Sequence, residues 1–124
     1  MPDTHILHLA SNNAWLAAVE SGTYSADSLS TEGFIHCSKT SQIVDVANTF
    51  YRGQHGLVLL VIDPSKLKAE LKWEPPAEPV PTHAREGELF PHIYGSLDID
   101  AITEVIPFEP AADGTFSLPE TFSG

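Results

Sequence analysis

Six consecutive apolar residues, LVLLVI at positions 57–62, form the longest apolar run of the chain. No polar residue interrupts the run, so nothing in it marks one face as exposed to solvent. Such a segment is typical of a strand that is buried on both faces. It is also too short to cross a bilayer, so the sequence predicts no membrane protein. We therefore expect residues 57–62 to form a central strand covered on two sides.

Two helices are expected before this strand. Ser11 or Asn12 is a good N-cap for a first helix that ends at Gly22. A second helix should begin at Thr40 or Ser41, because the residues after it are apolar at the spacing of one helix face. That face comprises Ile43, Val44, Ala47, Phe50 and Tyr51. Short strands are expected just before the helices, at 5–9 and 33–38, and the polar residues 23–32 should form a loop.

The chain after residue 62 is expected to consist mainly of strands and turns. A helical turn should follow at 64–66, and strands at 71–74, 90–94 and 102–108, with a proline-rich extended loop over 75–86. Two early helices and mostly late strands favour an α+β fold over a parallel α/β sheet. The length of 124 residues indicates one domain over 1–110, followed by a loosely ordered tail over 111–124.

The charge balance restricts the classes of partner. Seventeen acidic residues against six basic ones give a net charge of −11 with neutral histidine. General binding of nucleic acid depends on Lys and Arg that neutralise phosphates, and this chain has only Arg52 and Arg85 as arginines. We therefore expect no nucleic acid as partner; the small-molecule nucleotide that we do expect follows from the histidines and the resemblance below. The oligomeric state is not predicted.

Two features of the sequence favour the cytoplasm. The first residues lack the basic and apolar segments of a secretory signal. The single cysteine, Cys37, has no partner within the chain for a disulfide. Its neighbour in the expected strand, His36, should point to the opposite face. We interpret Cys37 as a buried apolar thiol and not as a nucleophile paired with His36.

The histidines are the main indication of a binding site in this sequence. His8, His36 and His92 each lie in a short strand beside a turn, on three separate elements. By strand alternation, His36 should share a face with Phe34 and Ser38. Imidazole donates and accepts hydrogen bonds and titrates near neutral pH. We expect these three histidines to line one pocket.

Two other interpretations of the histidines stay open. Each histidine alone is also typical of a core residue that is hydrogen-bonded to the backbone. Three dispersed histidines could hold zinc with an open coordination position. The chain has neither His-x-His nor His-Glu-x-x-His, so we expect no metal.

Several motifs taken together resemble one family of small bacterial proteins. The residues that carry the resemblance are Ile6–Ala10, Trp15, Gly22, Gly33–Ser38, Trp73–Glu74 and Phe90–Gly95. They are similar to the domain-of-unknown-function 952 family, over residues 4–108. That family is grouped with the ADP-ribosyltransferase-like fold. The resemblance thus implies a split, strongly curved β-sheet with a cleft for a nicotinamide dinucleotide.

Two segments carry the wider resemblance and imply roles for single residues. The segment at 8–11 is similar to the His-Gly-Thr/Ser of the ADP-ribosyltransferase-like superfamily, so His8 would hold a ribose hydroxyl. The segment at 36–38 is similar to one in RNA 2′-phosphotransferases, so His36 and Ser38 would line the nicotinamide–ribose side. His92 would occupy a late-strand position where many transferases place glutamate. Tyr94, in the same motif, is assigned to ligand binding.

The expected chemistry depends on a carboxylate. Breaking a nicotinamide–ribose bond builds positive charge on the ribose carbon, and a nearby carboxylate stabilises that charge. Glu74 is the candidate, provided that its strand end reaches the cleft. With His36 and His92 it forms the expected catalytic set, for ADP-ribosyl or phosphoribosyl chemistry with NAD as substrate. The alternatives are a non-catalytic module that binds a nucleotide or another small ligand and, more weakly, a metal-dependent hydrolase.

Overall fold

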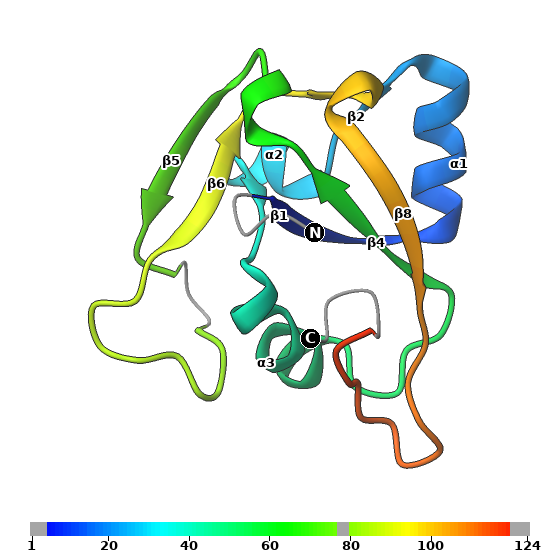
Figure 1. Cartoon of the computed structure of the whole chain (residues 1–124), viewed down its shortest axis with the longest axis vertical. Helices are drawn as coiled ribbons and strands as arrows, with labels where there is room; N and C mark the ends of the chain where they lie inside the picture. Colours follow the sequence, from blue (N-terminus) through cyan, green and yellow to red (C-terminus); the bar gives the residue numbers. More distant parts are fainter. Residues whose placement is uncertain (1–4, 77–79, 120–124) are drawn as a thin grey trace.

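The computed structural model describes residues 5–76 and 80–119 and has a mixed α+β fold (Figure 1). The helices in these ranges are α1 (Asn12–Ser21), α2 (Asp27–Thr31) and α3 (Thr40–Phe50). The strands are β1 (Ile6–Ser11), β2 (Thr23–Tyr24), β3 (Ile35–His36), β4 (Leu57–Ile62), β5 (Glu70–Glu74), β6 (Phe90–Tyr94), β7 (Leu97–Asp98) and β8 (Ile102–Phe108). Short 3-10 turns follow β4 and β7, at Pro64–Lys66 and Ile99–Ala101.

Strand β4 has the central position that its apolar run predicts. It pairs antiparallel with β1 on one side and with β8 on the other, and every residue of β4 is buried. Leu60 belongs to a core cluster that includes Ala18 of α1, whereas Leu59 belongs to a second cluster with Ile43 and Ala47 of α3. The two helices therefore cover opposite faces of this sheet (Figure 1).

The ends of the two predicted helices follow local chemistry. Ser11 caps α1 by accepting a hydrogen bond from the backbone N–H of Ala14 at 3.0 Å. Gly22 ends the helix with a φ of 90°, a left-handed conformation that favours glycine. In α3 the predicted buried face is correct at Ile43 and Ala47 but wrong at Phe50, which is 41% exposed. Phe50 is the last residue of the helix and reaches the edge of a cavity described below.

The loop expected over 23–32 is wrong, because the segment contains β2 and α2. Strand β2 pairs with β7, placing Thr23 opposite Asp98 and Tyr24 opposite Leu97. Tyr24 is buried in the first core cluster. These short elements depend on partners that are distant in the sequence, so local polarity gave no sign of them.

Strands β3, β6 and β5 form a second sheet, with β6 in the middle. Ile35 lies opposite Ile93 and His36 lies opposite His92. The isoleucines belong to the first core cluster, so one face of the sheet is core. By strand alternation the opposite face carries both histidines. Strand β3 is shorter than the predicted strand over 33–38, although Cys37 still donates its backbone N–H to the carbonyl of Pro91.

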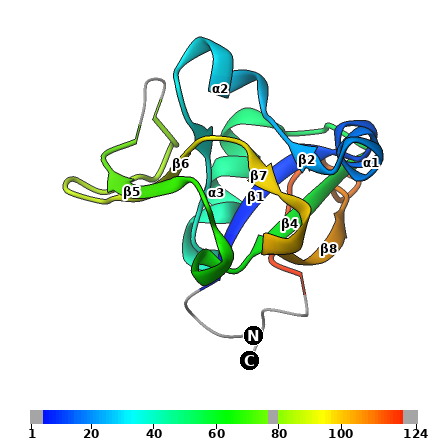
Figure 2. The same ribbon diagram turned by 90° about the horizontal axis from the view of Figure 1, so that it is seen from above.

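A single bridge joins the two larger sheets in the part of the chain that the structure describes. The backbone N–H groups of Leu7 and Ser38 each donate to the other residue's carbonyl, at 2.8 Å. Seen from above, β5 and β6 lie on one side of the molecule and β4 and β8 on the other (Figure 2). The bridge fixes Ser38 at the junction between them.

The segment after β8 packs onto α3 in its described part. Phe116 is buried, and its ring stacks on that of Phe108 with 4.8 Å between centroids. Asn48 of α3 bonds to the backbone N–H and carbonyl of Phe116. The predicted end of the domain near residue 110 stays a prediction, and residues 120–124 lie outside the described ranges. No helix within those ranges has the length and apolar character needed to cross a bilayer.

Candidate functional site

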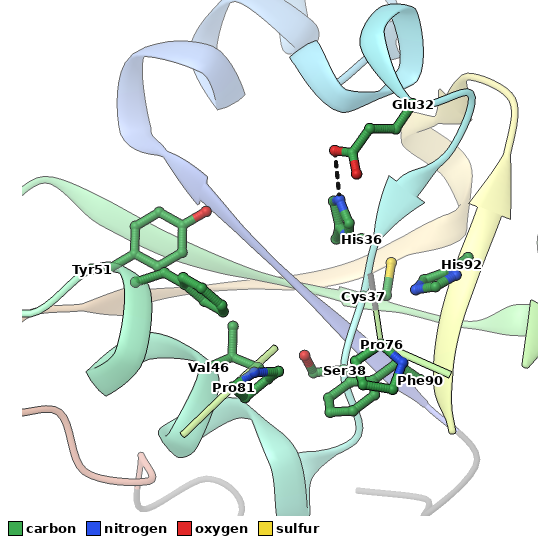
Figure 3. Close-up of a pocket in the computed structure, with 11 residues that line it drawn as sticks. Glu32, His36, Cys37, Ser38, Val46, Tyr51, Pro76, Pro81, Phe90 and His92 are labelled. Atoms are coloured by element: carbon green, nitrogen blue, oxygen red, sulfur yellow. Dashed lines mark hydrogen bonds and ion pairs between the residues drawn. The ribbon is translucent and has the colours of Figure 1, made fainter. Parts of the chain in front are cut away.

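A cavity of about 370 Å³ opens between α3 and the histidine-bearing face of the second sheet (Figure 3). Its lining residues are Glu32, His36, Cys37, Ser38, Val46, Phe50, Tyr51, Pro76, Pro81, Phe90 and His92. We call it the aromatic cavity, because the rings of His36, Phe50, Tyr51, Phe90 and His92 are part of its wall. Tyr51 and His92 lie on opposite sides, with His36 and Ser38 between them (Figure 3). Its volume lies in the range of small-molecule sites.

His92 is held by a carboxylate behind it. Its Nδ1 lies 2.8 Å from Oε1 of Glu74, and the same oxygen accepts a 2.6 Å hydrogen bond from the hydroxyl of Tyr94. Both bonds lower the pKa of Glu74, that from Tyr94 contributing most, and the bond between Tyr94 and Glu74 raises the pKa of Tyr94. Because an ionised carboxylate only accepts, His92 must donate from Nδ1 to it. The other ring nitrogen, Nε2, has no hydrogen-bond partner among the described residues.

His36 forms the second carboxylate–imidazole pair of the cavity. Its Nε2 lies 2.9 Å from Oε2 of Glu32, and the side chains are 44% and 39% exposed, so this pair stands at the cavity rim (Figure 3). The rings of His36 and His92 meet edge to face with 5.6 Å between centroids. The structure thus places two imidazoles side by side, each bonded to its own glutamate.

Phe34 fixes the orientation of both imidazoles. Its ring stacks on His92 with 4.2 Å between centroids and an angle of 24°, and it meets His36 edge-on at 4.8 Å. Such contacts restrict the rings without using their nitrogen atoms. The free nitrogen of each imidazole therefore stays available to a ligand.

A second cavity of about 360 Å³ adjoins the first. His36, Ser38, Val46 and Tyr51 line both, so the two cavities are neighbours, and we call the pair the cleft. Its wall is mainly apolar, but we call it the polar cavity after the hydroxyl and carboxylate groups that it also contains, those of Ser11, Tyr24, Ser25, Asp27 and Ser28. Ser38 is 4% exposed, and its hydroxyl has no hydrogen-bond partner among the described residues.

His8 lies at the back of the polar cavity, and both of its nitrogens are occupied. Nδ1 donates to the backbone carbonyl of His36 at 2.6 Å, since a carbonyl only accepts. Nε2 accepts from the hydroxyl of Tyr24 at 2.8 Å. Burial lowers the pKa of His8 to about 4, so the ring is neutral at pH 7.

Cys37 is buried, as predicted, and lies in the first core cluster. Burial raises the pKa of its thiol, which keeps the sulfur protonated and unreactive at neutral pH. No group of three or more His, Cys, Asp or Glu side chains within residues 5–76 and 80–119 is placed to hold a metal ion. The geometry therefore lends no support to the metal-dependent hydrolase.

A family model described as "Protein of unknown function (DUF952)" matches residues 9–105. The chain belongs to the DUF952 family. Three solved structures of the protein CC0527 from Caulobacter crescentus are similar to it. A crystal structure has 31% identity and a TM-score of 0.79, covering 95% of this chain and 97% of that one. A crystal structure of a double mutant has 30% identity, the same TM-score and the same coverage. The solution NMR structure has 31% identity, a TM-score of 0.77 and 97% coverage of both chains.

No curated protein matches this DUF952 chain. Membership confirms the predicted resemblance to the family. Because the family is described as one of unknown function, membership assigns no reaction. The wider ADP-ribosyltransferase-like grouping and the likeness to RNA 2′-phosphotransferases stay predictions.

The structure places the candidate residues of this DUF952 chain near the two cavities, but only some of them line the aromatic cavity directly. His36, Ser38 and His92 line the aromatic cavity directly. Glu74 and Tyr94 do not line it but reach it through His92. His8 borders only the polar cavity. The roles assigned to these residues stay predictions.

The sequence did not single out three further groups. Glu32 falls in the stretch expected to be a polar loop, yet it is the C-cap residue directly after α2 and bonds to His36. Tyr24 and Tyr51 are distant in the sequence from the other site residues, and they reach the site only when the chain is folded. Glu32 and His36 are four residues apart, and this spacing was the one local feature that could have predicted their contact at the cavity rim. Tyr51 was predicted only as part of a buried helix face, and Tyr24 was not singled out at all.

Proposed function

We propose that this chain binds a nucleotide in the cleft, with the heterocyclic base in the aromatic cavity and the ribose in the polar cavity. The observation that carries the proposal is that His36 and Ser38 belong to both cavities. A ligand made of a flat ring and a sugar needs adjoining compartments of these two kinds. NAD, which contains two such units, is the proposed ligand of first choice.

The aromatic cavity suits a flat heterocycle. Tyr51 and Phe90 offer ring surfaces, and Pro76 and Pro81 are apolar. Planar ligands are held by stacking and by burial of apolar area, while a few polar groups set their orientation. Nε2 of His92 is one such group here, because no described residue bonds to it.

The polar cavity suits a ribose. Sugar hydroxyls both donate and accept hydrogen bonds, and the side chains of Asp27, Ser28 and Ser38 can form hydrogen bonds with them. His8 would not contact the ribose directly. It would hold the backbone of His36 in place through the hydrogen bond from its Nδ1. In that case the ribose hydroxyl that the resemblance assigns to His8 would bond to Ser38 instead.

Two features support the ADP-ribosyltransferase-like architecture as part of the proposal. The described β-structure is split into separate sheets, with one bridge between the two larger ones. His8 and His36, the residues similar to that superfamily, meet at the proposed cleft. The architecture remains our proposal, since likeness to the CC0527 structures does not test it.

Cleavage of the bond between ribose and base is a second candidate function. Glu32 favours it, because its carboxylate lines the aromatic cavity while that of Glu74 is occupied by two hydrogen bonds. In such a step the C1′–N bond breaks and its electron pair goes to the ring nitrogen. Water adds to C1′ and gives its proton to Nε2 of His92, while the carboxylate stabilises the positive charge on the ribose.

Binding is tested by thermal unfolding with NAD, nicotinamide mononucleotide and adenosine monophosphate. We expect at least one of them to raise Tm, because a ligand at 100 times its Kd adds about 2.7 kcal/mol of stability. His36→Ala should abolish the rise. His55→Ala is the matched control, since His55 is exposed and bonds to Glu109 outside both cavities. If none of the three raises Tm at millimolar concentration, the proposal fails.

Cleavage is tested by chromatography of nicotinamide released from NAD. Glu32→Gln should lower the rate about a hundredfold, the usual effect of removing one electrostatic contact to the transition state. Glu104→Gln makes the same change of charge on β8, at an exposed residue outside both cavities. Binding without release from the wild-type chain would leave the first function and exclude the second.

A further inference from the structure

Strand β5 is an end strand with one open edge. The order of its sheet is β3–β6–β5, so β6 covers one edge of β5 and no strand of the described chain covers the other. In Figure 1, β5 lies outside β6 at the left of the molecule, on the side away from α1. Such an edge offers unpaired backbone N–H and C=O groups to a further strand. A second chain can therefore extend the sheet at this place.

Pro91 of β6 determines which backbone groups of β5 point outward. Trp73 lies opposite Pro91, which has no N–H, and the carbonyl of Pro91 accepts from Cys37 on the other side of β6. Trp73 and Pro91 therefore exchange no backbone hydrogen bonds. Because backbone groups alternate in direction along a strand, those of Leu71 and Trp73 face the open edge. Outside the pairing of β5 with β6, no described residue bonds to the backbone of either one.

The side chains of β5 alternate between charged and apolar. Glu70, Lys72 and Glu74 lie on the face that carries the histidines, since Lys72 is opposite His92. Leu71 and Trp73 lie on the other face. Trp73 is 45% exposed, and exposed tryptophan is enriched among the residues that contribute most to protein–protein binding. The open edge thus combines free backbone groups, alternating charges and one large apolar side chain.

The charges of β5 distinguish between the ways in which two copies of the strand can pair. Antiparallel pairing centred on Lys72 places the two lysines opposite each other and each Glu70 opposite Glu74 of the other copy. Pairing centred on Trp73 instead places each Lys72 opposite Glu74 of the other copy. Like charges directly opposite destabilise a strand pair, and opposite charges stabilise it. The charge pattern therefore favours the centre at Trp73 over the centre at Lys72.

The exposed tryptophan distinguishes the two centres that remain. Pairing centred on Leu71 also joins opposite charges, but it places Trp73 opposite Ala69, which lies outside β5. Pairing centred on Trp73 places the two tryptophans opposite each other. Aromatic pairs across neighbouring strands are among the more stabilising ones. The centre at Trp73 therefore covers the apolar side chain that this sheet leaves exposed.

We infer that two copies of this chain associate through β5, antiparallel and centred on Trp73. Each Trp73 donates its backbone N–H to the Trp73 carbonyl of the other copy, which joins the two three-stranded sheets into one. Lys72 pairs with Oε2 of Glu74 in the second copy, an oxygen that no described residue bonds, because His92 and Tyr94 both use Oε1. The association places a cation of the second copy beside the carboxylate that orients His92. It does not depend on the proposed function.

Sedimentation velocity of the full chain over a range of concentrations tests the inference. At physiological salt, which screens the repulsion between two chains of net charge −11, the mean mass should rise from 13.4 kDa toward twice that value. Trp73→Ala and Lys72→Glu should each weaken the association about tenfold. Lys66→Glu makes the same change of charge at an exposed residue outside β5 and should have much less effect. A wild-type chain that stays monomeric at millimolar concentration would overturn the inference, and this measurement needs no variant.

Two charge variants test the centre of the pairing. Lys72→Glu and Glu74→Lys each place like charges opposite each other, so each alone should associate about tenfold more weakly than the wild type. An equimolar mixture of the two should recover the association, because every opposed pair then has opposite charges. A mixture that does not recover it, with both variants folded by circular dichroism, would overturn the centre at Trp73. Glu70→Lys should not weaken the association, and a loss in that variant would also overturn this centre, in favour of Leu71.

Discussion

The two larger sheets of this protein differ in what covers their faces. In the β1–β4–β8 sheet, helices and side chains cover both faces of the central strand, whose residues are all buried. In the β3–β6–β5 sheet, one face enters the core through Ile35 and Ile93, and the other presents His36 and His92 to a cavity. The first sheet supplies stability, and the second combines stability with a binding surface. Substitutions should therefore separate the two contributions.

The largest effect is expected in the first sheet. Leu60→Ala removes a fully buried side chain from the middle of β4 and should cost about 3 kcal/mol in free energy of unfolding, through lost burial and the cavity left behind. Chemical denaturation monitored by circular dichroism measures it. Glu104→Ala on the neighbouring strand β8 is the exposed control. A cost below about 1 kcal/mol for Leu60→Ala would contradict the view that this sheet carries the stability.

Acid should destabilise the protein through His8, which joins the two sheets. The unfolded chain binds a proton at this ring near pH 6.5, whereas the folded chain binds it only near pH 4. Stability is therefore lost as the pH falls through this window, by about 3 kcal/mol in total. Denaturation at a series of pH values measures the slope. His8→Asn keeps a donor for the carbonyl of His36 and should flatten that slope, although its stability is lower at every pH. An unchanged slope in this variant would assign the acid sensitivity to another group.

A smaller effect, confined to binding, is expected at Glu74. Glu74→Gln removes the charge that orients His92 and should weaken binding of nicotinamide riboside about tenfold, the change typical of losing one charged hydrogen bond. The free energy of unfolding should change by less than about 1 kcal/mol, because Glu74 lies at a strand end and is partly exposed. Glu70→Gln changes the same charge at the other end of β5 and should have no effect on binding. Equal losses in both variants would indicate a general charge effect in place of orientation.

The smallest effect is expected at Tyr94. Tyr94→Phe deletes the hydrogen bond that contributes most to the lowered pKa of Glu74, so that pKa should rise toward its usual value. Since a lowered carboxyl pKa stabilises the folded state above it, the variant should lose a little stability at neutral pH and less in acid. Titration of the Glu74 carboxyl carbon by NMR measures the change. A pKa that does not move would mean that His92 alone holds the carboxylate ionised.

The sequence predicted elements whose causes are local. The apolar run at 57–62 identified the central strand, and Ser11 and Gly22 identified both ends of α1. Strand alternation placed His36 and Ser38 on one face, and both line the aromatic cavity. Each of these predictions needs only a few neighbouring residues. That is why they succeeded without knowledge of the fold.

Elements with distant partners were missed. Strand β2 is two residues long and exists through its pairing with β7, some seventy residues later. The bonds of His8 to Tyr24 and to the backbone of His36 likewise depend on the assembled fold. Glu32 was missed because it lies in a polar stretch of the sequence. Polarity alone does not distinguish an acidic residue in a solvent-exposed loop from one that lines a cavity.

The position of Cys37 provides a reporter of motion that requires no engineering. It is the sole cysteine of the chain, and it is buried in the wall of the aromatic cavity and held as a thiol. A disulfide reagent reaches so buried a thiol more readily when the residues around it move apart. The rate of labelling thus measures how often the cleft comes apart, and slower labelling with a bound molecule would register occupancy from inside the protein.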